Sequence, residues 1–336
     1  MFAILCATVM FLQAGIIATN QNVTARMDSS SGSENDRAVY ILTDGYSADY
    51  TDGVYVGYNN SYISLIVSNG ASLTKTNDIL FYISRKLTCS YNKLIITGSD
   101  SKVQFGPLSA DGIFDFAVGF TGSTNNTLEI LDGASFTIAG DFISYPSVLP
   151  SVIMDNNSSL HCYSRSYLGG THGVASLSIK NGSTFYCGNR VSVGGGREAL
   201  VEVNGFGSKL ETSGQFRYSG TNSLVSTEND ALIRIPSASI TYYTDPTSFF
   251  GLAGGFLACK DNMDSTIYFK LWNGTSWVQP ASLAAAEALG WSKTTYATDE
   301  EALAETGYDG LGGYTIYTGG ERMAPIVPDG TCIIIK

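Results

Sequence analysis

Three arginines near one corner of a repeating pattern are the residues best suited to bind an anion. Arg165 and Arg190 each lie four residues before a glycine that follows an apolar residue, and Arg217 lies three residues before Gly220. A guanidinium group carries a permanent positive charge and offers several N–H donors to carboxylate or phosphate groups. If the repeat keeps its register, the groups stack on one face and repel each other unless acids or an anionic ligand lie between them. We therefore consider two interpretations, solvated arginines paired with nearby carboxylates and a strip that binds acidic glycans.

Residues for acid–base or metal chemistry are sparse. Asp111 and Asp115 lie four positions apart, and paired carboxylates are what glycoside hydrolysis requires. The same run also fits a turn followed by a strand. The two histidines, His161 and His172, are eleven residues apart and have no cluster of cysteines or carboxylates around them. We therefore predict no catalytic residue, no metal ligand and no cofactor.

Arg190 lies within, and Arg165 lies two residues before, a stretch at residues 167–210 in which two near-copies of one unit follow each other directly. Each copy has an apolar residue before glycine, a turn, an alternating apolar strand, Asn-Gly and a second short apolar strand. The first copy contains Leu168-Gly169 and Asn181-Gly182, and the second contains Val193-Gly194 and Asn204-Gly205. Units of this length cannot bury their apolar face alone, so they stack as coils of a solenoid.

Weaker copies of the unit extend the pattern in both directions. They lie at 62–73, 93–103, 127–136, 151–160 and 223–233. Short alternating segments bounded by Asn-Gly or glycine-rich corners are typical of β-strands, and coils stacked in this way pair in parallel. Glycine and asparagine suit the corners because they tolerate positive φ most easily. We therefore expect Leu177 and Leu200 to lie close together on neighbouring coils.

The cysteines follow the same interval. Without Cys6 in the apolar N-terminal run, five cysteines remain, and their spacing fits neither a disulfide framework nor a zinc site. Cys162 and Cys187 are 25 residues apart, so they should lie on adjacent coils about 4.8 Å apart. The pattern favours a ladder of small buried thiols, with a disulfide as the alternative.

Composition limits the location and the partners. Only 15% of the 336 residues are charged and the net charge is −11, which argues against binding to nucleic acid or to anionic lipid headgroups. Residues 1–18 are apolar and resemble a secretory signal cleaved near Ala18. An unprocessed anchor or a misassigned start codon is the alternative, because no Lys or Arg precedes the apolar run. We expect a secreted or cell-surface protein with no membrane span in the mature chain.

Four segments are expected along the chain. They are a signal peptide at 1–18, a flexible leader at 19–37, a parallel β-helix at 38–255 and a C-terminal α+β module at 256–336. The last segment should contain a hairpin turning at Asn273-Gly274, short helices at 280–289 and 298–307, and closing strands at 312–317 and 331–335. Such a module would cap the open end of the solenoid, which is otherwise an aggregation-prone edge.

The repeat residues also suggest a family. The recurring Val-Gly, Leu-x-Ile and Asn-Gly-Ala/Ser-x-Leu/Phe pattern of residues 38–235 resembles the passenger-type β-helix repeats of secreted autotransporter-like and adhesin-like bacterial proteins, which share the right-handed fold of pectate lyases. The resemblance implies an all-β, right-handed parallel β-helix and an exported protein. It brings no catalytic residue with it.

Two functions remain in view. The first is an exported, non-enzymatic structural or adhesin-like surface protein whose partners are cell-surface or extracellular glycans. The alternative is a carbohydrate-binding or polysaccharide-degrading protein on the same scaffold. An enzyme should present two or three ionisable side chains in one cleft, whereas a structural stack should present uncharged polar ladders. Tyr58, Tyr62, Tyr163 and Tyr167 could stack on sugar rings or shield strand edges.

Overall fold

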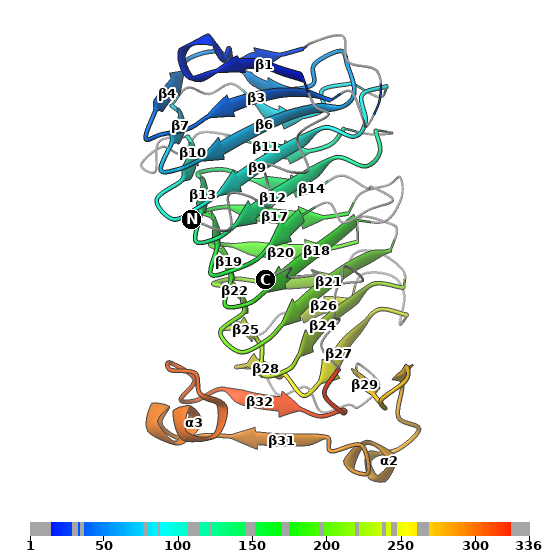
Figure 1. Cartoon of the computed structure of the whole chain (residues 1–336). Coiled ribbons are helices and arrows are strands. Elements are labelled where there is room, and N and C mark those ends of the chain that lie inside the picture. Colours follow the sequence, from blue (N-terminus) through cyan, green and yellow to red (C-terminus); the bar gives the residue numbers. More distant parts are fainter. Residues whose placement is uncertain are drawn as a thin grey trace, which may run out of the picture.

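The protein is a parallel β-solenoid, as the repeat predicts (Figure 1). The computed structural model describes residues 15–28, 33, 37–76, 80–86, 88–106, 115–120, 123–144, 152–169, 175–194, 198–218, 222–236, 240–242, 247–260 and 269–323. Within these ranges, the strands form three sheets that run the length of the molecule, here named sheets I, II and III.

From β3 to β26, successive strands belong to sheets I, II and III in turn. Sheet I contains β1 (Gly15–Thr19), β3 (Ala38–Leu42), β6 (Ile63–Ser68), β9 (Lys93–Thr97), β12 (Thr127–Leu131), β15 (Val152–Met154), β18 (Ala175–Lys180), β21 (Ala199–Asn204), β24 (Leu224–Glu228), β27 (Phe249–Ala253), β29 (Phe269–Trp272) and β30 (Trp277–Val278). Sheet II contains β4 (Ser47–Tyr50), β7 (Ser72–Lys75), β10 (Lys102–Phe105), β13 (Ser135–Ile138), β16 (Ser159–Cys162), β19 (Thr184–Cys187), β22 (Lys209–Thr212), β25 (Leu232–Ile235), β28 (Phe256–Cys259), β32 (Thr315–Thr318) and β31 (Ser292–Thr295). Sheet III contains β2 (Arg26–Met27), β5 (Val54–Val56), β8 (Phe81–Ile83), β11 (Phe116–Val118), β14 (Phe142–Ser144), β17 (Arg165–Leu168), β20 (Arg190–Val193), β23 (Phe216–Tyr218) and β26 (Ile240–Tyr242).

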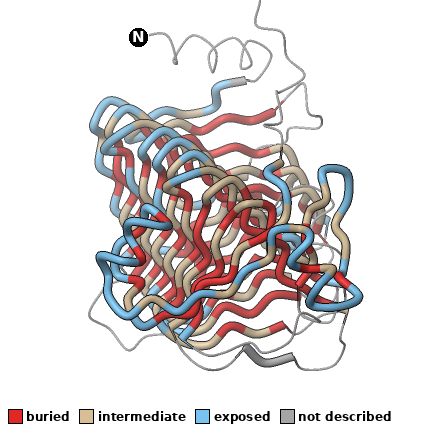
Figure 2. Tube along the Cα trace, turned by 90° about the horizontal axis from the view of Figure 1, so that it is seen from below, coloured by how far each residue is buried: buried red, intermediate tan, exposed pale blue. Residues whose placement is uncertain are grey.

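The core is a continuous apolar column between the three sheets. Along a strand, side chains alternate between the core and the outer face, and β18 shows this as alternating buried and half-buried residues. Figure 2 shows buried positions along the strands and exposed positions at the corners. Phenylalanines of neighbouring coils contact each other edge to face in the column, with ring centroids 5.0 Å apart for Phe81 and Phe116 and 4.7 Å apart for Phe116 and Phe136. Such ring contacts add to the stabilisation from area burial.

The corners have the backbone conformation that their residues predict. Between β18 and β19, Asn181 and Gly182 have φ of 50° and 79°. After β20, Gly194 has φ of 72°, and its N–H donates to the carbonyl of Leu168 in the preceding coil at 2.7 Å. Both corners need the left-handed conformation, which most residues adopt only at a cost.

The register of β18 and β21 refines the expected repeat. The two strands are neighbours, which confirms that Leu177 and Leu200 lie close together, but Leu177 pairs with Val201 and Ser176 pairs with Leu200. Leu177 is 1% exposed, whereas Leu200 points outward and is 42% exposed. The interval in sheet I is therefore 24 residues at this point, while the interval in sheet II between Cys162 and Cys187 is 25.

The N-terminal segment joins the first coil. Residues 1–14 of the predicted signal peptide lie outside the described residues, while β1 pairs in parallel with β3. Within the predicted leader, the 3-10 helix η1 (Asn20–Asn22) is followed by β2, which pairs with β5. Val23 and Met27 are buried in the core. The described part of residues 19–37 thus differs from a flexible leader, because these two apolar side chains fix it to the solenoid.

Parallel pairing continues beyond residue 255. Strand β28 pairs in parallel with β25, and β29 pairs in parallel with β27. The strand pairing then changes from parallel to antiparallel. Strands β29 and β30 form the predicted antiparallel hairpin, and β32 pairs antiparallel with both β28 and β31. This C-terminal module lies at one end of the solenoid (Figure 1). It covers the edge of β28 that would otherwise be open to pairing with other chains.

Two short helices complete the module. They are α2 (Leu283–Glu287) and α3 (Asp299–Thr306). The Thr298 hydroxyl accepts a hydrogen bond from the Glu301 N–H at 3.2 Å, and Gly307 ends α3 with φ of 76°, as the predicted capping box requires. The predicted closing strand at 331–335 lies outside the described residues. Neither α2 nor α3 is long and apolar enough to cross a membrane, and the described residues include no other helix that is.

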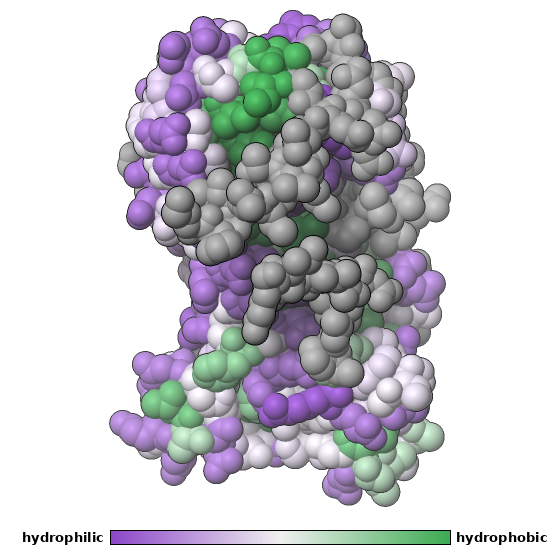
Figure 3. Space-filling view, viewed as in Figure 1, coloured by the Kyte–Doolittle hydropathy of each residue, from purple (hydrophilic) through white to green (hydrophobic). Residues whose placement is uncertain are grey.

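The outer face of sheet I changes from apolar to polar along the solenoid. Ile41, Ile66 and Ile95 pair in register on β3, β6 and β9, and Glu129 follows at the equivalent position of β12. Figure 3 shows a hydrophobic patch over this end of the molecule. Ile16 and Ile17 at the same end are 63% and 51% exposed. The three arginines singled out from the sequence lie away from this patch, on or beside the strands of sheet III.

Candidate anion-binding face

The first two predicted arginines are in register on sheet III. Arg165 and Arg190 begin β17 and β20 and pair directly with each other. Arg217 pairs with Ser192 instead, two positions further along the strand, so it shares the outer face but not the column. The structure therefore brings Arg165 and Arg190 together and places Arg217 to one side.

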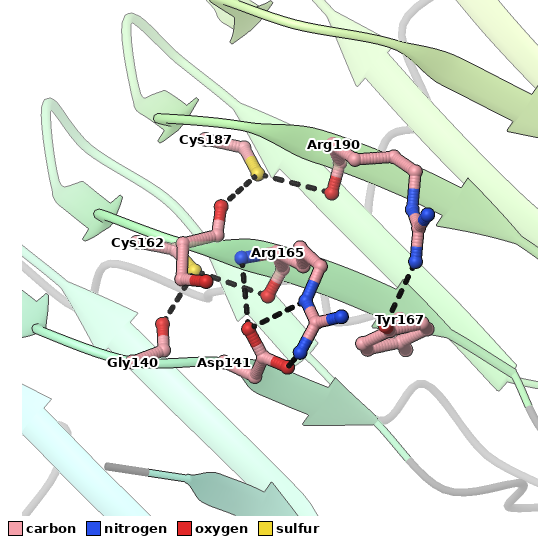
Figure 4. Close-up of polar contacts among 8 residues, drawn as sticks. Gly140, Asp141, Cys162, Arg165, Tyr167, Cys187 and Arg190 are labelled. Carbon is pink, nitrogen blue, oxygen red and sulfur yellow. Dashed lines mark hydrogen bonds and ion pairs between the residues drawn. The ribbon is translucent and has the colours of Figure 1, made fainter. Parts of the chain in front are cut away.

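Arg165 is held by a carboxylate of the preceding coil. Its Nε and terminal nitrogens donate to the two carboxylate oxygens of Asp141 at 3.2 and 2.7 Å (Figure 4). The Arg165 backbone N–H donates to the same carboxylate at 3.0 Å. These hydrogen bonds, together with the charge attraction, raise the pKa of the Arg165 guanidinium. Arg165 thus fits the interpretation in which a nearby acid neutralises the charge.

Arg190 has a different environment. A terminal nitrogen of its guanidinium donates to the Tyr167 hydroxyl at 2.8 Å, and the group lies 5.5 Å from the centre of the Tyr167 ring (Figure 4). Among the described residues, no carboxylate forms an ion pair with Arg190, and its buried Nε has no hydrogen-bond partner. Its positive charge is therefore available to a ligand.

Two aspartates continue the same column toward the N-terminus. Asp115 and Asp141 directly precede β11 and β14, which pair in register, and Arg165 and Arg190 occupy the equivalent positions of the next two coils. Burial and, after it, the negative charge of Asp141 raise the pKa of Asp115. Asp111, the other acid considered as a candidate, lies outside the described residues. Because Arg165 occupies both oxygens of Asp141, this pair of acids is poorly placed for hydrolysis, where both carboxyl groups must face the substrate.

A second cationic group lies over aromatic rings nearer the N-terminus. The Arg85 guanidinium is 5.1 Å from the centre of the Tyr82 ring and 5.6 Å from that of Phe120. Tyr82 is parallel to Tyr55 of the preceding coil, with centroids 6.4 Å apart. No described carboxylate pairs with Arg85, so its charge is compensated only by ring faces, which attract cations weakly.

Arg85 lacks the sequence signal of the other arginines. In its coil, Ser84 rather than a glycine follows the apolar strand and occupies the corner, with φ of 70°. The usable signal is position, because Arg85 comes two residues after the end of β8, in sheet III. We name the outer side of sheet III the arginine face, since it carries five of the nine arginines of the chain. These are Arg26, Arg85, Arg165, Arg190 and Arg217.

A pair of glutamates on sheet I was also missed. Glu202 of β21 and Glu228 of β24 are bridged by the Asn204 side-chain amide, which donates to them at 3.2 and 2.9 Å. Lys180 pairs with Glu202 at 3.0 Å, and the Ser226 hydroxyl donates to Glu228 at 2.8 Å. The available signal was an acid at an outward strand position of two successive coils.

Burial gives this pair an unusual titration. Glu228 is 4% exposed, and burial, followed by the charge of Glu202, raises the pKa of Glu228 to about 7. Hydrogen bonds from Asn204 and Ser226 occupy both oxygens of its carboxyl group. Since the group is covered and fully bonded, we interpret the pair as part of a polar ladder rather than as a catalytic dyad.

The predicted histidines and tyrosines have neighbours within the chain. His161 lies half-buried between Tyr163 and Tyr186, with centroids 4.1 and 4.6 Å away, and burial lowers its pKa. His172 lies outside the described residues. Tyr62 is stacked on a neighbouring tyrosine, and Tyr58 lies beneath the Arg26 guanidinium. In the ranges given above, no three His, Cys, Asp or Glu residues are grouped so that they could hold a metal ion.

The arginine face therefore combines Arg85 and Arg190, which have no carboxylate partner among the described residues, with ion pairs at Arg26–Asp28 and Arg165–Asp141. Comparison of the chain with protein-family models, with curated proteins and with solved structures gave no match. The arrangement can bind negatively charged groups on a ligand that spans several coils.

Proposed function

We propose that this protein is an exported, adhesin-like surface protein whose arginine face binds anionic glycans. The proposal follows the resemblance to passenger-type, right-handed β-helices of adhesin-like bacterial proteins. It is supported chiefly by Arg190, which lies on the outer side of a parallel stack, donates to Tyr167 and has no carboxylate partner among the described residues.

The repeat suits a polymeric ligand. Successive strands are about 4.8 Å apart, and Arg85, just after β8, and Arg190, on β20, are separated by four such steps in sheet III, or about 20 Å. A polyanionic glycan carries negative groups along its chain and can reach both arginines at once. Linked contacts of this kind increase the overall affinity well beyond that of one arginine. The aromatic rings beside Arg85 and Arg190 add flat apolar surface against which sugar C–H groups can pack.

Charge elsewhere on the chain supports selectivity for this face. The net charge is −11, so overall charge does not attract a polyanion and binding must depend on local cationic groups. On the outer side of sheet II, uncharged Ser135, Ser159 and Thr184 pair in register between Lys102 and Lys209, so this column has a polar ladder at its centre.

The test compares glycans of different charge on the full chain. Binding to an immobilised sulfated polysaccharide, a polyuronate and a neutral polysaccharide is measured at increasing salt. We expect binding to both anionic polymers, weakening with salt because exposed charges are screened, and no binding to the neutral one. The double variant Arg85→Gln and Arg190→Gln should lose at least about tenfold in affinity, equivalent to about 1.4 kcal/mol.

Arg234→Gln is the matched control. Arg234 lies on sheet II and pairs with Glu211 at 3.3 Å, so its loss should leave glycan affinity unchanged. Equal binding to the neutral polysaccharide, or an unchanged affinity in the Arg85 and Arg190 double variant, would refute the proposal.

A further inference from the structure

Two free cysteines lie just inside the corner that leads to the arginine face. Cys162 and Cys187 end β16 and β19, pair in register and are fully buried. Both thiols point into the core between adjacent coils. This confirms the predicted ladder of buried thiols.

The thiols contact the backbone of the two stacked arginines. The Cys162 sulfur lies 3.3 Å from the carbonyl oxygen of Arg165, and the Cys187 sulfur lies 3.3 Å from that of Arg190 (Figure 4). Each sulfur also lies within hydrogen-bond distance of a carbonyl in the preceding coil, at Gly140 for Cys162 and at Ser164 for Cys187. The thiol pair and the arginine pair are thus joined through two backbone carbonyls.

The two thiols also interact with each other. The neighbouring Cys187, followed by burial, raises the pKa of Cys162, and the neighbouring Cys162 lowers that of Cys187. The thiolate is the nucleophile in thiol–disulfide exchange.

The spacing permits a covalent bond. In-register residues of adjacent parallel strands are about 4.8 Å apart, and disulfide-linked residues have Cα atoms about 4.4–6.8 Å apart. A bond between Cys162 and Cys187 would therefore need little movement of the backbone.

We propose that Cys162 and Cys187 form a reversible disulfide between adjacent coils, and that the bond alters the backbone beneath Arg165 and Arg190. The oxidant is a small or protein disulfide. The Cys187 thiolate attacks one sulfur of this donor, which releases one thiolate and leaves a mixed disulfide. The Cys162 sulfur then attacks the sulfur of Cys187 and expels the second thiolate.

The reaction is balanced and has a structural consequence. The donor gains two electrons, and the two protons from the cysteines pass to the released thiolates. Both cysteines lose their S–H donors, so the Arg165 and Arg190 carbonyls lose these hydrogen bonds. Because both thiols are buried, exchange takes place during folding or through local opening of the coil. An oxidising compartment outside the cytoplasm favours the bond.

A threonine in the same ladder suggests suitable substitutions for the two cysteines. Thr212 pairs with Cys187 at the next position of the ladder, and its hydroxyl donates to the Asn189 carbonyl at 3.2 Å. Threonine can therefore keep the hydrogen bond to the carbonyl of the preceding coil while removing the sulfur chemistry, which makes Cys162→Thr and Cys187→Thr suitable variants. Cys259 is also buried in sheet II, but its register partners are Ile235 and Thr315. Cys259→Ala is thus the control.

The full chain is treated with oxidised glutathione or with dithiothreitol, alkylated after unfolding and analysed by peptide mass spectrometry. We expect a peptide pair joined through Cys162 and Cys187 only after oxidation, a Tm raised by several degrees, and reversal by dithiothreitol. Both threonine variants should remain folded and show neither change, while Cys259→Ala should behave as wild type. Full alkylation of both cysteines after oxidation, or their equal linkage to other cysteines, would overturn the disulfide.

Coupling to the arginine face is measured separately and rests on the proposed function. Affinity for the sulfated polysaccharide should differ at least about twofold between oxidised and reduced wild type and should not differ in Cys162→Thr. A linked peptide with unchanged affinity would contradict the coupling while leaving the disulfide in place. Loss of glycan binding in both redox states would count against the proposed function alone, since the linked peptide is detected independently of any ligand.

Discussion

Arg165 and Arg190 occupy equivalent positions on neighbouring coils, yet within the described part of the chain only Arg165 meets a carboxylate. Asp141 accepts two hydrogen bonds from the Arg165 guanidinium, whereas Arg190 donates to the Tyr167 hydroxyl. One arginine of the stacked pair therefore stabilises the stack, and the other is available to a ligand. This difference gives separate predictions for the two positions.

Replacing Asp141 by Asn should increase affinity for anionic glycans. The change removes one negative charge from the arginine face and releases the Arg165 guanidinium from its ion pair. Because Arg165 is partly exposed, the cost in unfolding free energy should be about 1 kcal/mol or less. Polysaccharide binding and urea denaturation of the same preparation measure both effects. Asp49→Asn, at an exposed position of sheet II, is the control, and a lower affinity in Asp141→Asn would contradict the assignment.

Glu228 should make the protein less stable as the pH rises toward neutrality. Its pKa in the folded chain is about 7, above the ordinary value of 4.5, so between these values the folded state holds a proton that the unfolded state lacks. The contribution is fully present below the lower value and is lost as the pH passes through the higher one, by up to about 3 kcal/mol. The charged neighbours that face the carboxyl group are Glu202 and Lys180.

Glu228→Gln tests this titration. Glutamine keeps the shape of the side chain and cannot ionise, so the difference in stability from wild type should grow in favour of the variant between about pH 5 and about pH 8. Urea denaturation at the two pH values measures it. The same pH slope in variant and wild type would show that another group is responsible.

Phe116→Ala should destabilise the solenoid strongly. Phe116 is fully buried and its ring contacts those of Phe81 and Phe136, so truncation should cost about 3–5 kcal/mol. Leu200→Ala, at the outward position 42% exposed, should cost less than about 1 kcal/mol. Thermal unfolding followed by circular dichroism compares the two. A larger loss at Leu200 than at Phe116 would mean that the register of β21 is wrong.

Tyr308→Phe should loosen the C-terminal module. The Tyr308 hydroxyl accepts from the Gly207 N–H at 2.9 Å and donates to the Asp230 carbonyl at 2.7 Å, which ties the module to two coils. Burial raises the pKa of this hydroxyl to about 12, so it remains a donor at neutral pH. Losing both bonds should cost about 1–3 kcal/mol and speed amide hydrogen exchange in β31 and β32. Unchanged exchange there would contradict the role of Tyr308 as a tether.

The repeat was enough to predict the solenoid and part of the candidate site. Arg165 and Arg190, like Cys162 and Cys187, stack because their interval equals one coil. Arg217 falls out of the column because 27 residues separate it from Arg190, which places it opposite Ser192. A difference of two residues keeps the side chain on the same face but moves it along the strand.

Other contacts could not be predicted from the sequence, because they depend on parts of the chain in which the repeat pattern is weak. Asp141 lies between the copies of the unit at 127–136 and 151–160, so its approach to Arg165 follows only from the register of β14 and β17. In the same way, β2 has two residues and gives no periodic signal, although Met27 is fully buried. Burial of Glu228 likewise depends on what surrounds the strand rather than on the strand itself.

The most direct test of the proposed role of the arginine face is a chemical footprint of the arginines. The full chain is treated with an arginine-selective dicarbonyl reagent, with and without a sulfated polysaccharide, and the modification of each arginine is measured by mass spectrometry. We predict that the polysaccharide slows modification of Arg85 and Arg190 and leaves Arg234 on sheet II unaffected. Unchanged modification of Arg85 and Arg190, or equal protection of Arg234, would contradict the assignment of this face as the binding surface.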